Sequence, residues 1–213
     1  MYARALVFDL DGTLVDSLGD IAHHLNDALA ERGLPTHEPA QIGTWVGEGT
    51  EKLVERAVAR PELRHEAGVA YRARYRAHPV IHTHVYPGIP AVLDALAGTP
   101  LAILSNKPHD LTVAIAQVLL ARWPFRVIAG EGTGRPRKPD PAGALAILGE
   151  LGVAPAEAAM IGDSEIDIQT ARATGMRSVA VSWGFRPRER LATADAIVDS
   201  PDQLAALLLA AAR

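Results

Sequence analysis

The chain alternates between short apolar segments and longer segments with helical periodicity, and this alternation constrains the fold more than any other feature. The helical patterns lie between most of the short segments, for example at residues 111–120, 141–151 and 165–174. Strands that are apolar throughout are typical of a parallel sheet that is covered by helices on both faces. The predicted strands span residues 5–8, 101–104, 126–129, 159–161, 178–181 and 196–198.

One long interval interrupts this alternation. After the first predicted strand, the next begins only at residue 101, and the interval from about 17 to about 84 holds helical patterns alone. In the first of these patterns, at 21–29, the adjacent His23 and His24 are predicted to be solvated. Such an interval is too long for an ordinary connection in an α/β unit. The sequence therefore predicts a doubly wound, Rossmann-like parallel sheet core, at 1–16 and 85–213, with an inserted α-helical cap domain at 17–84.

Composition narrows the class of protein. With 213 residues, 48% of them hydrophobic, the chain can bury a substantial core, and residues 203–212 are predicted to form a last amphipathic helix. The net charge of −4 gives no reason to expect nucleic acid as a partner, and the lack of cysteine excludes thiolate chemistry. No export signal and no apolar stretch long enough for a bilayer is found. We expect a cytoplasmic protein without a membrane partner, either a monomer or a homodimer.

Two carboxylates follow the first predicted strand. Asp9 and Asp11 end a segment that is otherwise apolar, where they are costly unless a cation meets them. In open α/β sheets the carboxyl ends of the strands are where ligands bind, and Gly12 permits a tight turn there. A plain strand–turn–helix connection explains this motif equally well when it is taken alone.

Three further polar motifs occur, each after a later predicted strand. Ser105 and Asn106 offer a hydroxyl and an amide to phosphate oxygens, although such residues also cap helices. Lys138 supplies a point cation, or is a solvated loop lysine. Asp163 and Asp167 are suited to complete an oxygen-rich site for a hard cation with the first motif. The order of the four motifs, all at strand ends, is far more specific than any one of them.

With these motifs the chain resembles the haloacid-dehalogenase superfamily from end to end. Within it, the chain is most similar to phosphoglycolate phosphatases, through the segments WVGEGT at 45–50, SNKP at 105–108 and GDS at 162–164 followed by Asp167. The resemblance implies the same α/β core with a helical cap. It also implies a Mg²⁺-dependent phosphoric monoester hydrolase that acts on a small phosphate ester, with 2-phosphoglycolate as the first candidate, through an aspartyl-phosphate intermediate.

The resemblance also assigns roles to residues of this sequence. Asp9 would be the nucleophile, Asp11 the general acid and base, and Lys138 the cation that orients Asp9 and the phosphate. The phosphoryl group would be held by Thr13, Ser105 and Asn106. The Mg²⁺ ligands would be Asp9, the backbone carbonyl of Asp11, and Asp163, with Asp167 acting directly or through water.

The loop at 47–50 is a candidate for recognising the leaving group of the substrate. Gly47 and Gly49 allow close backbone approach, and amides at the start of a helix form an anion site that suits the carboxylate of glycolate. Glu48 would repel that carboxylate unless its side chain points to solvent. The alternative is that the glycines form only a turn and that Thr50 is only a helix cap.

Other functions share parts of this pattern. Sugar phosphomutases of the β-phosphoglucomutase type share all four motifs, and a pyrophosphatase also fits. Dehalogenases and phosphonatases do not place an aspartate where Asp11 stands. A receiver-type signalling domain, which accepts phosphate without metabolic turnover, is disfavoured by the long insertion and by Asp11.

Overall fold

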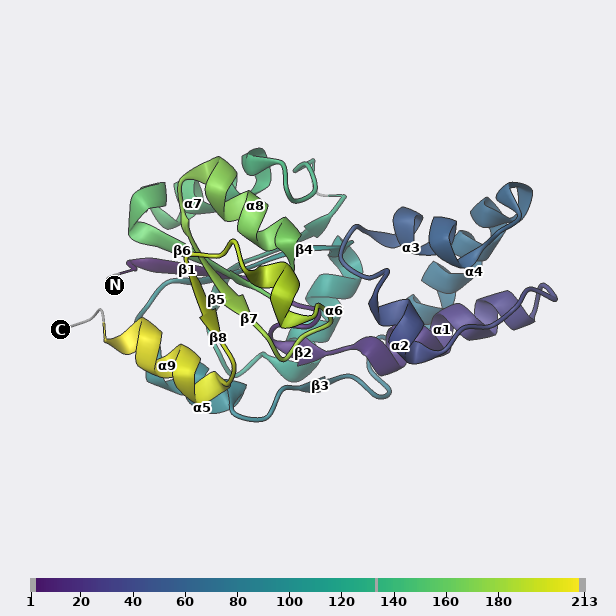
Figure 1. The fold of residues 1–213 in the computed structure, drawn as a ribbon, viewed down its shortest axis with the longest axis horizontal. Coiled ribbons are helices and arrows are strands. Elements are labelled where there is room, and N and C mark those ends of the chain that lie inside the picture. The colour runs from purple at the N-terminus through teal and green to yellow at the C-terminus, as the bar shows by residue number, and fades with distance from the viewer. Residues whose placement is uncertain (1–2, 133, 211–213) are drawn as a thin grey trace.

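A six-stranded parallel sheet lies at the centre of the fold (Figure 1). The computed structural model describes residues 3–132 and 134–210. Within them the strand order is β5-β4-β1-β6-β7-β8, and all neighbouring strands in this sheet are parallel. Because the connections run in opposite directions on the two sides of β1, a crevice forms at the carboxyl ends of β1 and β6. The strands are β1 (Ala5–Phe8), β4 (Leu101–Pro108), β5 (Phe125–Glu131), β6 (Ala158–Gly162), β7 (Arg177–Val181) and β8 (Ala196–Val198).

The side chains of β1 show why the sheet is covered on both faces. Leu6 and Phe8 pack in one hydrophobic cluster with α5, α6 and α9, whereas Ala5 and Val7 pack in a second cluster with α7 and α8. Successive residues of a strand point to opposite faces, so a strand that is apolar throughout needs helices on both sides. This confirms the predicted doubly wound core. The covering helices are α5 (Ile89–Ala95), α6 (His109–Leu119), α7 (Pro141–Leu151), α8 (Glu165–Thr174) and α9 (Pro201–Leu209).

The predicted helical insertion is present and begins and ends at a small second sheet. Strands β2 (Val15–Asp16) and β3 (His84–Val85) pair in antiparallel orientation where the chain leaves the core and returns to it. The sequence pattern does not predict these two strands. Figure 1 shows the inserted helices grouped to one side of the large sheet. They are α1 (Leu18–Ala30), α2 (Pro39–Gly43), α3 (Thr50–Ala57) and α4 (Arg64–Ala77). Short 3₁₀ turns span Pro61–Leu63 in the insertion, and Pro155–Glu157 and Arg188–Leu191 in the core.

The prediction that His24 is solvated is wrong. His24 is only 2% exposed, and its Nε2 atom lies 3.0 Å from the carbonyl oxygen of His78. The ring also lies 4.8 Å from the ring of Tyr75 on α4. Helix α1 packs against α4 as well as against α2, so more than one of its faces is buried. Burial lowers the pKa of His24, which keeps the imidazole neutral.

A buried carboxylate ties the start of the insertion to its end. Asp20, in the first turn of α1, accepts hydrogen bonds from the backbone N–H groups of Ile81, His82 and Thr83 and from the Thr83 hydroxyl. The segment that returns to the core is thereby fixed against the segment that leaves it.

Helix α9 ends at Leu209, whereas the sequence predicts a helix over 203–212, and residues 211–213 lie outside the described residues. None of the helices in the described part of the chain has the length and apolar character needed to cross a bilayer.

Candidate active site

The carboxylate of Asp9 lies at the carboxyl end of β1 against a buried lysine. Lys138 Nζ is 2.9 Å from Asp9 Oδ1 and 2.6 Å from Asp167 Oδ1, and Asp9 and Lys138 are 6% and 5% exposed. Asp9 Oδ1 also accepts a hydrogen bond of 2.7 Å from the N–H of Leu10. The lysine therefore fixes the position of Asp9, and it is a buried ion-pair partner rather than a solvated loop residue.

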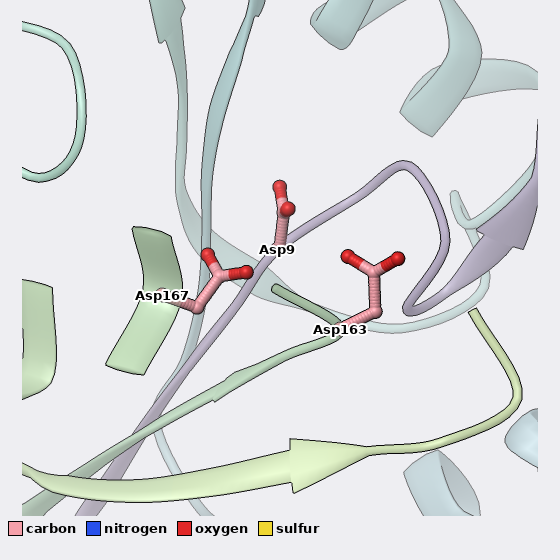
Figure 2. A group of neighbouring side chains, drawn as sticks. All are labelled: Asp9, Asp163 and Asp167. Atoms are coloured by element: carbon pink, nitrogen blue, oxygen red, sulfur yellow. The ribbon is translucent and has the colours of Figure 1, made fainter. Parts of the chain in front are cut away.

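Three carboxylates converge beside this lysine. Figure 2 shows Asp9, Asp163 and Asp167 around one small space, and each offers a ligand oxygen within 4.8 Å of the others. Asp163 follows β6, and Asp167 lies in the first turn of α8, where it forms a capping box with the N-cap residue Ser164. Asp163 is not itself the cap. Its Oδ2 atom accepts a hydrogen bond of 2.6 Å from the N–H of Phe185.

The electrostatics of this cluster favour a bound cation. Burial raises the pKa of Asp9 to about 7, Lys138 opposes that rise, and the charge of Asp167 adds to it. Burial, followed by the charges of Asp167 and Asp9, raises the pKa of Asp163 well above its ordinary value. Three buried carboxylates facing one buried ammonium leave an excess of negative charge. A divalent cation with oxygen ligands would remove this excess, so the residues fit such a metal.

Asp11 has a different environment from Asp9. Its Oδ1 atom accepts a hydrogen bond of 2.5 Å from Ser17, and Lys107 Nζ lies 3.1 and 3.2 Å from its two carboxylate oxygens. Lys107 Nζ also donates to the hydroxyl of Tyr75, on α4, at 3.0 Å. The sequence motifs give Lys107 no role, although its position directly after Ser105 and Asn106, at a strand end, is a signal that it belongs to the site.

Of the predicted phosphate-binding residues, Ser105 and Asn106 line the same cavity as Asp9 and Asp11, whereas Thr13 is not among the residues that line it. Thr13 Oγ1 is buried and has no hydrogen-bond partner among the described residues. Ser105 Oγ accepts a bond of 3.2 Å from the N–H of Lys107. The amide of Asn106 bonds both the carbonyl and the N–H of Lys138, at 2.9 and 2.8 Å, and donates to the carbonyl of Gly47 at 2.9 Å. Asn106 therefore positions the Lys138 segment, and its contact with phosphate stays a prediction.

The insertion and the core share one cavity. Its core lining includes Asp9, Asp11, Ser105, Lys107 and Asp163, and its lining from the insertion consists of Ile21, Val46, Gly47, Gly49, Thr50, Leu53 and Tyr71. The remaining lining residues, which are also from the core, are Asn106, Pro108, Leu111, Ser164, Phe185 and Arg186. The candidate nucleophile and acid therefore face side chains of the inserted helices.

The loop at 47–50 has a backbone conformation, at its two glycines, that residues other than glycine rarely adopt. Gly47 and Gly49 have φ angles of 112° and 88°, in the left-handed region. Glu48 pairs with Arg56 on α3, its side chain is 41% exposed, and it is not among the residues that line the cavity. Thr50 is the first residue of α3 rather than its N-cap, which is Gly49.

Comparison with known proteins agrees with this geometry. The chain is 36% identical over 184 residues to a phosphoglycolate phosphatase of Aquifex aeolicus, which covers 85% of this chain and 86% of that one. It is 40% identical over 206 residues to a phosphoglycolate phosphatase of Rhodospirillum rubrum, with coverage of 91% and 85%. The solved structure of a haloacid dehalogenase-like hydrolase from Streptococcus pneumoniae superposes with a TM-score of 0.89 at 28% identity, covering 96% of this chain and 98% of that chain.

A family model covers most of the site as well as most of the fold. The matched region, residues 3–175, includes both carboxylate motifs, Lys138 and the whole insertion. By this match, and by its similarity to the relatives above, the chain belongs to the haloacid dehalogenase-like hydrolases.

Proposed function

We propose that the protein is a Mg²⁺-dependent phosphatase that hydrolyses a small phosphate monoester through an aspartyl-phosphate on Asp9. The observation that carries this proposal is the pairing of Asp9 with Lys138, beside Asp163 and Asp167, where Asp9 and Asp163 line a cavity that the core shares with the insertion. The family and the names of the relatives support phosphatase activity. The same names make 2-phosphoglycolate the first candidate substrate.

Asp9, Asp163 and Asp167 would hold the metal, together with the backbone carbonyl of Asp11. When bound, Mg²⁺ offsets the repulsion between the Asp9 carboxylate and the phosphoryl oxygens and stabilises the charge of the transition state. The excess negative charge of the cluster supports this assignment.

In the first chemical step Asp9 attacks the phosphorus atom. A bond forms between an Asp9 oxygen and phosphorus, the ester bond to the leaving alkoxide breaks, and the alkoxide takes a proton from Asp11. Lys138 holds Asp9 in position for this attack, and its charge opposes the repulsion between the two anions. We assign the hydroxyl of Thr13, which is buried without a partner among the described residues, as a donor to a phosphoryl oxygen.

In the second step water hydrolyses the aspartyl-phosphate. Asp11, now a carboxylate, takes a proton from the water, whose oxygen bonds to phosphorus as the bond to Asp9 breaks. Ser17 and Lys107 contact Asp11 and fix its orientation in both steps. The products are inorganic phosphate and an alcohol, and the starting protonation of Asp11 is restored.

We further propose that residues 17–84 act as a cap domain that selects the leaving group. Side chains and backbone from this segment form one side of the cavity. The exposed side chain of Glu48, which does not line the cavity, meets the condition under which the loop at Gly47 and Gly49 accepts a carboxylate. Both glycines also have positive φ angles, which other residues rarely adopt. Substituting either one would therefore strain the loop, whichever substrate is bound.

A screen of phosphorylated metabolites with Mg²⁺, ranked by kcat/KM, tests this function. We expect 2-phosphoglycolate to rank first and to release inorganic phosphate. The Asp11→Asn variant is expected to accumulate phospho-Asp9, visible in the intact mass after acid quenching. Conversion of β-glucose 1-phosphate into another sugar phosphate would instead indicate a mutase. Absence of turnover with every ester would contradict the proposal and favour a phospho-accepting domain.

A further inference from the structure

Arg186 connects the core to the insertion from a position that no motif marks. It lies in the segment 182–186 after β7, lines the shared cavity, and is only 7% exposed. Its Nη1 atom donates to the carbonyl of Gly43 at 3.0 Å, and its Nη2 atom donates to the carbonyl of Val46. Its Nε atom lies 3.6 Å from Glu165 Oε2. The guanidinium of this core residue is therefore occupied by the backbone of the insertion.

The segment that carries Arg186 is itself fixed by the candidate active site. Phe185 N donates to Asp163 Oδ2, and the indole N–H of Trp183 donates to the carbonyl of Thr13 at 3.2 Å. Gly184 packs so closely that a Cβ atom there would lie 2.3 Å from Asp163 Cβ and 2.4 Å from the carbonyl oxygen of Gly12. The position of Arg186 is thus set by the same residues that shape the carboxylate cluster.

A second core side chain holds the same stretch of the insertion. Asn106 donates to the carbonyl of Gly47, one residue after the carbonyl that Arg186 bonds. The carbonyls of residues 43, 46 and 47 therefore all accept from core side chains that line the cavity. Charge-assisted hydrogen bonds from a buried guanidinium are the stronger part of this contact.

We propose that Arg186 is a positioning residue that holds the segment 43–47 over the catalytic carboxylates and so encloses the leaving group. This inference rests on the proposed phosphatase function. The two carbonyls are reached by two different nitrogens of the planar guanidinium, whereas a lysine offers a single nitrogen without this fixed fork geometry. Enclosure acts on an ester with its leaving group, whereas inorganic phosphate binds at the core and has no leaving group to enclose.

The variants Arg186→Met and Arg186→Lys test the proposal, with Arg190→Met as the matched control. Arg190 lies in the following 3₁₀ turn and pairs with the same Glu165, but its side chain is 59% exposed. The control therefore removes a cation and an ion pair with Glu165 while leaving the contacts to Gly43 and Val46 intact. Thermal unfolding is measured first, and Arg186→Lys, which keeps the charge, carries the test if Arg186→Met does not fold.

Amide hydrogen exchange and kinetics provide two independent readouts. In both Arg186 variants we expect amide exchange in peptides covering 43–50 to accelerate by at least ~10-fold, because the local opening free energy falls. The kcat/KM for 2-phosphoglycolate should fall by at least ~10-fold, while the inhibition constant of inorganic phosphate changes less than about 2-fold. Arg190→Met should match the wild type in all three measurements.

Each contrary outcome has a defined meaning. Wild-type exchange at 43–50 in both Arg186 variants would overturn the proposal, as would an equal acceleration in Arg190→Met. If inhibition by inorganic phosphate weakens as much as kcat/KM for the ester falls, Arg186 belongs to the phosphate site. That outcome would also overturn the proposal. If the wild type hydrolyses no ester, the proposed function fails, and the exchange measurement alone decides the role of Arg186.

Discussion

At the scale of single residues, the charges of Asp9 and Lys138 depend on each other. Burial raises the pKa of Asp9 to about 7 even though Lys138 is in contact with it. Burial also disfavours the ammonium of Lys138, but Asp167 and Asp9 outweigh that effect and raise its pKa. The lysine is therefore charged at every working pH, whereas Asp9 needs further positive charge to be fully ionised near neutrality.

The variant Asp9→Asn tests both the role of Asp9 as nucleophile and the effect of its raised pKa on stability. We expect it to fold and to lose turnover, because the amide keeps the shape but does not attack phosphorus. In metal-free wild-type protein, the raised pKa of Asp9 contributes stability that is present below the ordinary value of 3.8 and is lost as the pH rises through about 7. Urea unfolding in chelator from about pH 5 to about pH 8 should show this loss in the wild type and less of it in Asp9→Asn.

Two outcomes would contradict this prediction. Activity above a few per cent of wild type at unchanged stability would mean that Asp9 is not the nucleophile. An identical pH dependence of unfolding in the two proteins would mean that Asp9 is not the group that titrates near neutrality in the metal-free state.

Removal of the buried Lys107 side chain should cost stability near the site. Its side chain is 5% exposed, and it is the cation that Asp11 contacts. Lys107→Met keeps the length of the side chain but leaves a buried carboxylate unpaired, so we expect a loss of about 3 kcal/mol in the free energy of unfolding. The control is Lys52→Met, at an exposed lysine that pairs only with Glu55 among the described residues. It should change the free energy of unfolding by less than about 0.5 kcal/mol.

A double variant separates the charge from the packing. In Asp11→Asn with Lys107→Met the buried carboxylate is gone, so part of the lost stability should return. If the double variant loses as much stability as the sum of the two single variants, the contact between Asp11 and Lys107 does not couple them, and the prediction is wrong. Urea denaturation of all four proteins makes the comparison.

At the scale of helices and strands, the sequence predicted the elements of the core and missed features that depend on tertiary contacts. The predicted strand at 101–104 ends at its last apolar residue, but β4 continues to Pro108. Ser105 and Asn106 stay buried there because the site surrounds them. Strands β2 and β3 are two residues each, and no local pattern marks a pair that forms only when the insertion closes on itself. His24 was misjudged because the burial of α1 by α4 is not a local property.

Asp20 shows how one carboxylate supports a whole element. Burial opposes its ionisation, but bonds from the Thr83 hydroxyl and from three backbone N–H groups outweigh burial and lower its pKa. Its contribution to stability is therefore present above the ordinary value of 3.8 and is lost as the pH falls through the lowered value. Asp20→Asn replaces one of the two accepting oxygens with an NH2 group, which cannot accept a hydrogen bond, so we expect a loss of about 2 kcal/mol in the free energy of unfolding.

The matched control for Asp20→Asn lies in the same helix. Asp27 has a half-exposed side chain that pairs with Arg74, and Asp27→Asn should cost less than about 1 kcal/mol. Chemical denaturation near neutral pH and at about pH 3 compares the variants, and Asp20→Asn should differ less from the wild type at the lower pH. Equal costs for the two substitutions would show that the bonds to residues 81–83 do not hold the insertion in place.

At the scale of the whole molecule, the core motifs could be predicted because a parallel sheet brings them together. Asp9 and Asp163 follow adjacent strands, so their proximity follows from strand order once the alternation of strands and helices is known. The contacts of Lys107 with Tyr75 and of Arg186 with Gly43 join the core to the insertion. They depend on how the inserted helices lie over the sheet, which periodicity does not encode.

Metal binding should stabilise the entire fold, because the carboxylate cluster is assembled only in the folded state. A ligand that binds the folded protein at about 100 times its Kd adds about 2.7 kcal/mol of stability. For a chain of this size that corresponds to a rise in Tm of about 5–10 °C. We therefore expect Mg²⁺ to raise Tm as well as to restore activity after treatment with EDTA, and Ca²⁺ to inhibit, because its looser coordination disturbs the in-line geometry.

The variant Asp163→Ala separates specific binding from a general effect of salt. It removes one of the three converging carboxylates, and with it the acceptor of the Phe185 N–H, so the stability of the variant in chelator serves as its own baseline. Mg²⁺ should then raise its Tm much less, and its activity should need far more Mg²⁺. Thermal scans with and without Mg²⁺, at matched ionic strength, give the comparison. Full wild-type activity in excess chelator, or an unchanged Mg²⁺-dependent rise in Tm in Asp163→Ala, would show that this cluster holds no metal that the reaction needs.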